Sequence, residues 1–205
     1  MRKSKKGKVK VPDFKVLTLG DSSVGKTSFI LKFIEDKFSL NYIATIGLDY
    51  KHKKINLSSG ETVGLRIFDT AGQERFKSIS LNFIKNANGI LLIYDISNKE
   101  TFDSVKGWMS SIKNAANENI SIVLVGNKCD LEEKREVTMD EGKEKANAYN
   151  VPFFETSCKE GINISETFQK LAEDIIKNKG NDIGNEGEVI SKENAKKMNK
   201  KSGCC

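Results

Sequence analysis

The stretch Gly20-Asp21-Ser22-Ser23-Val24-Gly25-Lys26-Thr27 matches the phosphate-loop pattern G-x-x-x-x-G-K-[ST], between an apolar run and a helical pattern. Glycines let the backbone curl, so that successive N–H groups and the start of the following helix can face a phosphate. We expect Lys26 to reach the β and γ phosphates and the Thr27 hydroxyl to bind magnesium. The loop does not name the nucleotide base, because ATPases, kinases and GTPases share it.

Apolar, β-branched runs alternate with helical patterns on both sides of this loop. Strands are predicted at 14–19, 50–57, 63–68, 89–94, 120–125 and 151–154, and helices at 25–36, 76–86, 100–116, 140–150 and 164–178. The turn Ser58-Ser59-Gly60 predicts one antiparallel hairpin. The sequence therefore predicts an α/β fold: a mostly parallel six-stranded sheet with one antiparallel strand, helices on both faces, and ligands at the carboxyl ends of the strands.

Two helix starts carry the spacing of a capping box. Ser97 precedes Glu100 by three residues, and Thr138 precedes Glu141 by three. In such a box each side chain bonds the backbone N–H of the other residue. We expect both helices to begin in this way.

The charge of the chain is concentrated at its ends. The net charge is +6, with six basic residues in 1–10 and five lysines against one glutamate in 192–201. Terminal blocks of like charge are typical of arms that lie on an acidic membrane or on nucleic acid, with a merely solvated tail as the alternative. The composition predicts a basic arm at 1–12, a folded domain at 13–179 and a flexible tail at 180–205 that ends in Cys204 and Cys205.

Membrane spans, disulfides and metal clusters are not expected from the sequence. The longest apolar stretch, Ile90 to Tyr94, is far shorter than the roughly 18 residues a span needs. No apolar core follows the basic start, so a secretory signal is not expected. The spacing of the four cysteines suits neither a disulfide framework nor a zinc site, and the single histidine, His52, is expected to be an ordinary strand residue.

Three more motifs follow predicted strands: Asp69-Thr70-Ala71-Gly72-Gln73-Glu74, Asn127-Lys128-Cys129-Asp130 and Glu155-Thr156-Ser157-Cys158-Lys159. Together with the phosphate loop, their order and spacing over about 14–178 resemble the Ras superfamily of small GTPases. The stretches at 46–51, 75–80 and 94–97 resemble those that mark Rab proteins. The chain therefore resembles the Rab family.

The resemblance implies a guanine site. A carboxylate at Asp130 can accept both the N1–H and the 2-amino group of guanine, which adenine does not offer. Asn127 and Lys128 are implied to shape the pocket and to connect it to the phosphate loop, while Phe38 stacks edge-on to the base. The nucleotide-binding residues so implied are Ser22, Ser23, Val24, Gly25, Lys26, Thr27, Ser28, Phe38, Tyr42, Thr45, Gly72, Asn127, Lys128, Asp130, Ser157, Cys158 and Lys159.

The resemblance also implies a magnesium-dependent switch between GTP and GDP. Thr27, Thr45 and Asp69 correspond to the residues that hold Mg²⁺, directly or through water, and Gly72 corresponds to an N–H donor to the γ-phosphate. Loss of that phosphate is expected to relax about 38–50 and 70–82. Gln73 is implied to orient the attacking water. No arginine matches a built-in finger, so slow hydrolysis is expected without an activating protein.

The chain departs from the family pattern at several positions. Ser22 and Ser23 stand where many relatives have at least one glycine, which leaves the intrinsic hydrolysis rate open. Phe68 replaces a usual tryptophan, and 82–84 replaces a usual pair of tyrosines, so partner identity is not carried over. Cys158 replaces a usual alanine, and we expect little effect because the pocket uses its backbone N–H.

The terminal Cys204 and Cys205 resemble the Rab substrate for double geranylgeranylation, with two unmodified thiols as the alternative. The implied partners are an exchange factor, a GTPase-activating protein, a GDP-dissociation inhibitor, an escort protein, and effectors that bind near 42–51 and 72–84. The implied function is regulation of vesicle trafficking at the cytoplasmic face of an intracellular membrane, in exchange with the cytosol and without nucleic acid. A phosphate-loop kinase or ATPase, and a scaffold that holds nucleotide without turnover, are the competing hypotheses.

Overall fold

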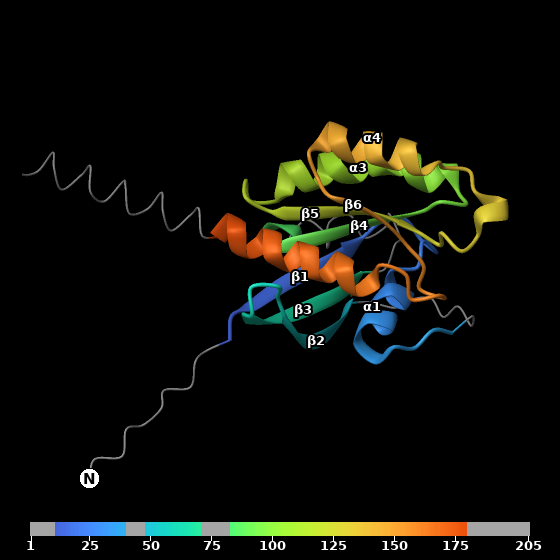
Figure 1. Ribbon diagram of the computed structural model, residues 1–205. Helices are drawn as coiled ribbons and strands as arrows, with labels where there is room; N and C mark the ends of the chain where they lie inside the picture. Colours follow the sequence, from blue (N-terminus) through green and yellow to red (C-terminus); the bar gives the residue numbers. More distant parts are fainter. Residues whose placement is uncertain (1–10, 40–47, 71–82, 180–205) are drawn as a thin grey trace, which may run out of the picture.

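A computed structural model describes residues 11–39, 48–70 and 83–179, which form one layered α/β unit (Figure 1). The sheet has six strands in the order β2-β3-β1-β4-β5-β6. They are β1 (Asp13–Leu19), β2 (Leu48–Asn56), β3 (Thr62–Thr70), β4 (Gly89–Asp95), β5 (Ser121–Asn127) and β6 (Phe153–Thr156). The β2–β3 pair is antiparallel and the other neighbouring pairs are parallel, so the predicted sheet is confirmed.

Helices cover both faces of the sheet, as predicted. Helix α1 (Lys26–Glu35) and the C-terminal helix, described over 164–179, lie on one face, and α3 (Lys99–Ala115) and α4 (Met139–Tyr149) lie on the other (Figure 1). A short 3-10 helix, η2 (Glu132–Lys134), follows β5. Of the helix predicted at 76–86, residues 83–86 are described: 83–85 are helical and Asn86 lies in a turn.

Two apolar layers hold the central strands. Every residue of β4 is buried, because helices pack on both of its faces. On one side, Phe33 of α1 stacks on Phe168 of the C-terminal helix with ring centroids 3.8 Å apart. On the other side, Tyr94 of β4 packs against Phe102 of α3 at 5.0 Å. This packing gives a rigid sheet that positions the loops at its edge.

Two local predictions need correction. The strand predicted at 151–154 begins two residues later, at Phe153. The reason is that Asn150 adopts φ 56° at the end of α4 and the Val151 N–H bonds the Ala146 carbonyl at 3.1 Å, so these residues close the helix.

The capping box is confirmed at one helix and wrong at the other. Thr138 and Glu141 form the reciprocal box at the start of α4. Helix α3 is capped instead by Asn98, whose side chain accepts from the Glu100 N–H at 3.0 Å. The Ser97 hydroxyl donates to Asp95 at 2.7 Å, because the carboxylate at the end of β4 competes for it.

Within the described ranges, no helix is both long enough and apolar enough to cross a membrane.

Candidate nucleotide-binding site

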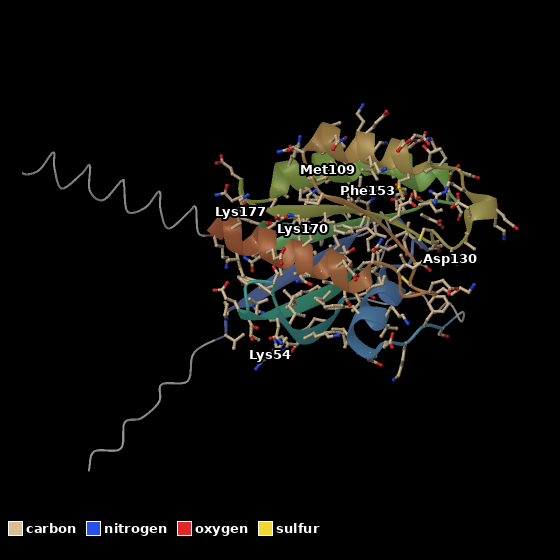
Figure 2. All side chains as sticks on the ribbon, in the orientation of Figure 1. Lys54, Met109, Asp130, Phe153, Lys170 and Lys177 are labelled. Carbon is tan, nitrogen blue, oxygen red and sulfur yellow. The ribbon has the colours of Figure 1, made fainter. Side chains whose placement is uncertain are left out.

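The predicted motifs meet at one edge of the sheet because they follow parallel strands. The phosphate loop follows β1, Asp69 lies near the end of β3, Asn127 ends β5, and Ser157 follows β6. Parallel strands present their carboxyl ends at the same edge, where α/β proteins bind ligands. Asp130 lies at this edge in Figure 2, beside the start of the loop that leads to η2.

Two glycines give the phosphate loop its shape. Gly20 has φ 139°, and a Cβ there would lie 2.0 Å from the Ile93 carbonyl oxygen. Gly25 has φ 99°, and a Cβ there would lie 2.5 Å from Nδ2 of Asn127. Any larger residue would therefore clash with the backbone of β4 or with the base motif while adopting a left-handed φ.

The N-terminus of α1 is prepared for an anion. No side chain caps it, and its first turn contains no acidic residue. The first N–H groups of a helix have no partner within the helix and carry a partial positive charge. The loop and the start of α1 together therefore suit a phosphate group.

Lys26 brings a buried cation to this loop. Its ammonium donates to the carbonyls of Gly20 at 2.9 Å and Asp21 at 2.6 Å. Burial lowers its pKa to about 8, against a smaller opposing effect of Asp69 and Asp21. A phosphate beside the ammonium favours its charged form, so the position fits an anionic ligand.

Thr27 and Asp69 place two oxygen ligands together. The Thr27 hydroxyl, from α1, donates to Oδ2 of the buried Asp69, from β3, at 2.6 Å. Mg²⁺ prefers few protein oxygens completed by phosphate and water, so the pair fits this ion. No group of three His, Cys, Asp or Glu side chains gathers as a metal site in the described ranges.

Asn127 connects the phosphate loop to the base motifs, as expected from the resemblance. Its side-chain N–H donates to the Val24 carbonyl at 2.8 Å. Its amide oxygen accepts from the Thr156 hydroxyl at 3.1 Å and from the Cys158 thiol at 3.4 Å. Three separate segments are thus tied through one buried amide.

Asp130 is oriented by Ser157, whose hydroxyl donates to its Oδ1 at 2.6 Å. Lys128, which was expected to bridge the pocket to the phosphate loop, adopts φ 67°, and its ammonium pairs with Asp95 at the end of β4 at 2.6 Å. Lys159 is exposed and pairs with Glu160 at 3.3 Å. Phe38, just after α1, is 39% exposed, which leaves its ring accessible to a base.

Cys158 and Ser23 mark two departures from the family pattern. Burial raises the pKa of the Cys158 thiol to about 12, so it is a neutral donor to Asn127. Ser23 adopts φ 64°, the left-handed region that glycine occupies at little cost. The departure noted at Ser23 therefore coincides with local backbone strain.

Two supporting contacts were not predicted from the sequence. Arg135 binds both carboxylate oxygens of the buried Glu155, at 2.7 and 3.0 Å. These hydrogen bonds stabilise the end of β6, which leads into the loop that contains Ser157 and Cys158. Trp108 of α3 donates to Asp21 in the phosphate loop at 2.8 Å. In the sequence, Glu155 could have been noticed only as a carboxylate at the end of a predicted strand. Trp108 could have been noticed only as the single tryptophan.

Several predicted site residues lie outside the described residues. These are Tyr42, Thr45, Gly72, Gln73, Cys204 and Cys205. Of the effector regions near 42–51 and 72–84, residues 48–51 and 83–84 are described.

Comparison with known proteins identifies relatives along most of the chain. The family model described as Ras family matches residues 15–177. Ras-related protein Rab-13 of Rattus norvegicus is 43% identical over 179 residues, which cover 87% of this chain and 88% of the relative. Ras-related protein Rab-3 of Caenorhabditis elegans is 46% identical over 162 residues, covering 79% and 74%. Ras-related protein Rab-10 of Diplobatis ommata is 45% identical over 163 residues, covering 80% and 81%.

Proposed function

The chain belongs to the Ras family and, within it, to the Rab GTPases, and on this premise we propose how its own residues work as a switch in vesicle trafficking. It binds GTP and GDP and hydrolyses GTP to GDP and phosphate. The observation that carries the proposal is the hydrogen-bond chain that joins Val24, Asn127 and Cys158, with Ser157 holding Asp130 beside it. These hydrogen bonds hold the Asp130 carboxylate, which contacts the base, at a fixed position relative to the phosphate loop.

Asp130 selects guanine by accepting two hydrogen bonds from the base. Hydrogen bonds to a charged group contribute about 1.5–3 kcal/mol each, and a base that lacks the donors leaves the carboxylate unpaired. The Ser157 hydroxyl limits the positions that the carboxylate can adopt. Selectivity against adenine therefore comes from the side chain of Asp130 and its support by Ser157.

Lys26 and the start of α1 hold the phosphates, and Thr27, Thr45 and Asp69 hold Mg²⁺. Held by these residues, Mg²⁺ would supply positive charge against the charge that develops on the transferred phosphoryl group. Gln73 orients the attacking water. Asp69 and Thr27 are preorganised by their mutual hydrogen bond, so little rearrangement of either side chain is needed.

Residues 13–179 form the nucleotide domain, with a basic arm at 1–12 and a tail at 180–205. Geranylgeranyl groups on Cys204 and Cys205 anchor the protein to the cytoplasmic face of an intracellular membrane, because two lipid chains bind stably where one binds reversibly. A GDP-dissociation inhibitor and an escort protein bind the lipidated form. An exchange factor and an activating protein set the nucleotide state, and effectors bind near 42–51 and 72–84.

Competition among GTP, ATP and XTP tests the assignment of the base site. Asp130→Asn replaces the carboxylate by an amide whose donor suits the 2-oxo group of xanthine. We expect GTP affinity to fall at least about a hundredfold, corresponding to about 2.7 kcal/mol, and XTP affinity to rise. Asp140→Asn, at an exposed carboxylate of α4, is the matched control. Unchanged preference for GTP in Asp130→Asn refutes the assigned role.

A further inference from the structure

Trp108 links the phosphate loop to the helix layer on the opposite side of the sheet from α1. The loop leads from β1 into α1, whereas Trp108 belongs to α3, which covers the other face (Figure 1). Its half-buried ring packs against the apolar cluster of that face. Its indole N–H donates to Oδ1 of Asp21 at 2.8 Å, across 87 positions of the chain. The loop is thus held from both layers of helices.

The indole and the carboxylate are complementary in their hydrogen bonding. An indole N–H is only a donor, and an ionised carboxylate is only an acceptor. A hydrogen bond to an ionised group is stronger than one between neutral groups. Because the ring of Trp108 is packed in place, it offers its N–H from a fixed position, and the Asp21 carboxylate is held on the α3 side of the loop.

Asp21 also lies beside the buried ammonium of Lys26. The backbone carbonyl of Asp21 accepts from that ammonium at 2.6 Å, and the Gly20 carbonyl accepts from it at 2.9 Å. Burial lowers the pKa of Lys26, and the negative charges of Asp69 and Asp21 oppose this effect. The Asp21 carboxylate is therefore close enough to Lys26 to influence its charge while its hydrogen bond goes to Trp108.

Both carboxylates that influence Lys26 accept a hydrogen bond from another side chain. Asp21 accepts from Trp108, and Asp69 accepts from the Thr27 hydroxyl at 2.6 Å. A carboxylate that turned to Lys26 would neutralise the charge that a phosphate needs, and its own negative charge would repel the phosphate. The two carbonyls that bind the ammonium are neutral, so they leave its charge available to an anion.

We propose that Trp108 is a positioning residue of the phosphate site: its indole N–H holds the Asp21 carboxylate away from Lys26 and from the phosphates. The inference rests on the proposed function, because the phosphates concerned are those of GTP and GDP. Without the hydrogen bond, the carboxylate turns toward Lys26, and the nucleotide is released faster. The N–H of the indole performs this role, so an aromatic ring that only fills the same space does not replace it.

A double-mutant cycle on the full-length chain tests the proposal. Trp108→Phe removes the N–H and keeps an aromatic ring, whereas Asp21→Asn keeps the Oδ1 acceptor and removes the charge. The release rate of a fluorescent GDP analogue is measured for both single variants and for the double variant. We expect Trp108→Phe to speed release at least about tenfold in the wild-type background, and less than about threefold in the Asp21→Asn background.

Tyr149→Phe is the matched control, because it removes a polar atom from a half-buried aromatic side chain of α4. It should leave the release rate unchanged. Equal acceleration by Trp108→Phe in the two backgrounds would show that the ring acts only by packing, and would overturn the proposal.

A spectroscopic measurement tests the contact itself without changing Trp108. The chain has a single tryptophan, so a proton–nitrogen correlation spectrum contains one indole N–H signal. A hydrogen bond to a carboxylate moves this proton to lower field. We therefore expect Asp21→Ala to move it to higher field, and Asp21→Asn to move it less. An unchanged signal in Asp21→Ala would overturn the proposal, even if Trp108→Phe failed to fold.

Failure of the proposed function can be distinguished from failure of this inference. A wild-type chain that does not bind the GDP analogue contradicts the proposed function. A wild-type chain that binds it, with no coupling between Trp108 and Asp21 in the cycle, contradicts only the inference. The free energy of unfolding in urea, measured for each variant, separates a loss of global stability from a faster release of nucleotide.

Discussion

Arg135 stabilises the loop at 157–159, which borders the nucleotide site, although Arg135 itself lies in another segment. Its guanidinium binds Glu155 through two hydrogen bonds, and Asn163 donates to the Glu155 backbone carbonyl at 2.7 Å. The Glu155 side chain is 5% exposed, so the guanidinium of Arg135 compensates a carboxylate that little water can reach. The pKa of Arg135 is accordingly raised, mainly by its hydrogen bond with Glu155.

Arg135→Ala is expected to destabilise the fold and to speed nucleotide release. Removing one partner of a buried ion pair costs about 3–5 kcal/mol, because the other charge stays buried and unpaired. The free energy of unfolding in urea and the release rate of a fluorescent GDP analogue measure the two effects. We expect release at least about tenfold faster, corresponding to about 1.4 kcal/mol. Glu132→Ala removes the exposed partner of Arg135 and should change little. Equal effects of the two variants would contradict the role of Glu155.

Gln73→Leu is expected to separate binding from hydrolysis. The side chain is proposed to act on water and not on the nucleotide, so affinity for GTP should stay within about twofold while hydrolysis stimulated by an activating protein falls by roughly a thousandfold or more. Single-turnover hydrolysis gives the stimulated rate, and nucleotide titration gives the affinity for GTP. A stimulated rate of GTP hydrolysis close to that of the wild type would contradict the proposed role of Gln73.

At the scale of elements, the start of α4 carries a pH-dependent contribution to stability. Glu141 bonds Lys99 and completes the capping box with Thr138. The Lys99 hydrogen bond, and then those with Thr138, lower the pKa of Glu141 from 4.5 to about 2. A lowered folded-state pKa stabilises the protein above the unfolded value, and this stabilisation is lost as the pH falls through the folded value.

Glu141→Gln is therefore expected to be less stable than the wild type at pH 7, with a difference that shrinks as the pH falls from about 4.5 to about 2. Thermal unfolding followed by circular dichroism over this range measures the difference. Glu144→Gln, at an exposed position of the same helix, is the control. A difference that does not vary with pH would show that the charge of Glu141 has no part in it.

At the scale of the whole molecule, membrane attachment and nucleotide binding are expected to be separable. Each lipid chain contributes about 0.8 kcal/mol per buried CH₂, and one chain alone binds reversibly. Cys204→Ser or Cys205→Ser alone should therefore give a partly cytosolic protein, and the double replacement a fully cytosolic one with unchanged GTP affinity. Cell fractionation and nucleotide titration measure both properties. Mass spectrometry of the membrane-bound wild type checks the chemistry: an unmodified terminus there refutes the lipid anchor.

Contiguous motifs were sufficient to predict the sheet and the parts of the site that lie within one segment. The phosphate loop, the base motif at 127–130 and the Thr138 cap each place interacting residues a few positions apart, so their spacing carries the geometry. The alternation of strand and helix patterns in turn predicts parallel strands with loops at one edge. Family membership followed from the same short motifs.

Contacts between distant segments were decided only by tertiary packing. Trp108 meets Asp21 across 87 positions, and Arg135 meets Glu155 across 20, with no periodic pattern to link either pair. Asn98 rather than Ser97 caps α3 because the folded end of β4 brings Asp95 to the Ser97 hydroxyl. The faces on which β2 places its side chains depend on its register with β3, since a shift by one residue would turn Lys54 and Tyr50 to the opposite face. Local sequence specifies dihedral preferences and hydrophobic period, whereas these partners exist only after the layers have packed.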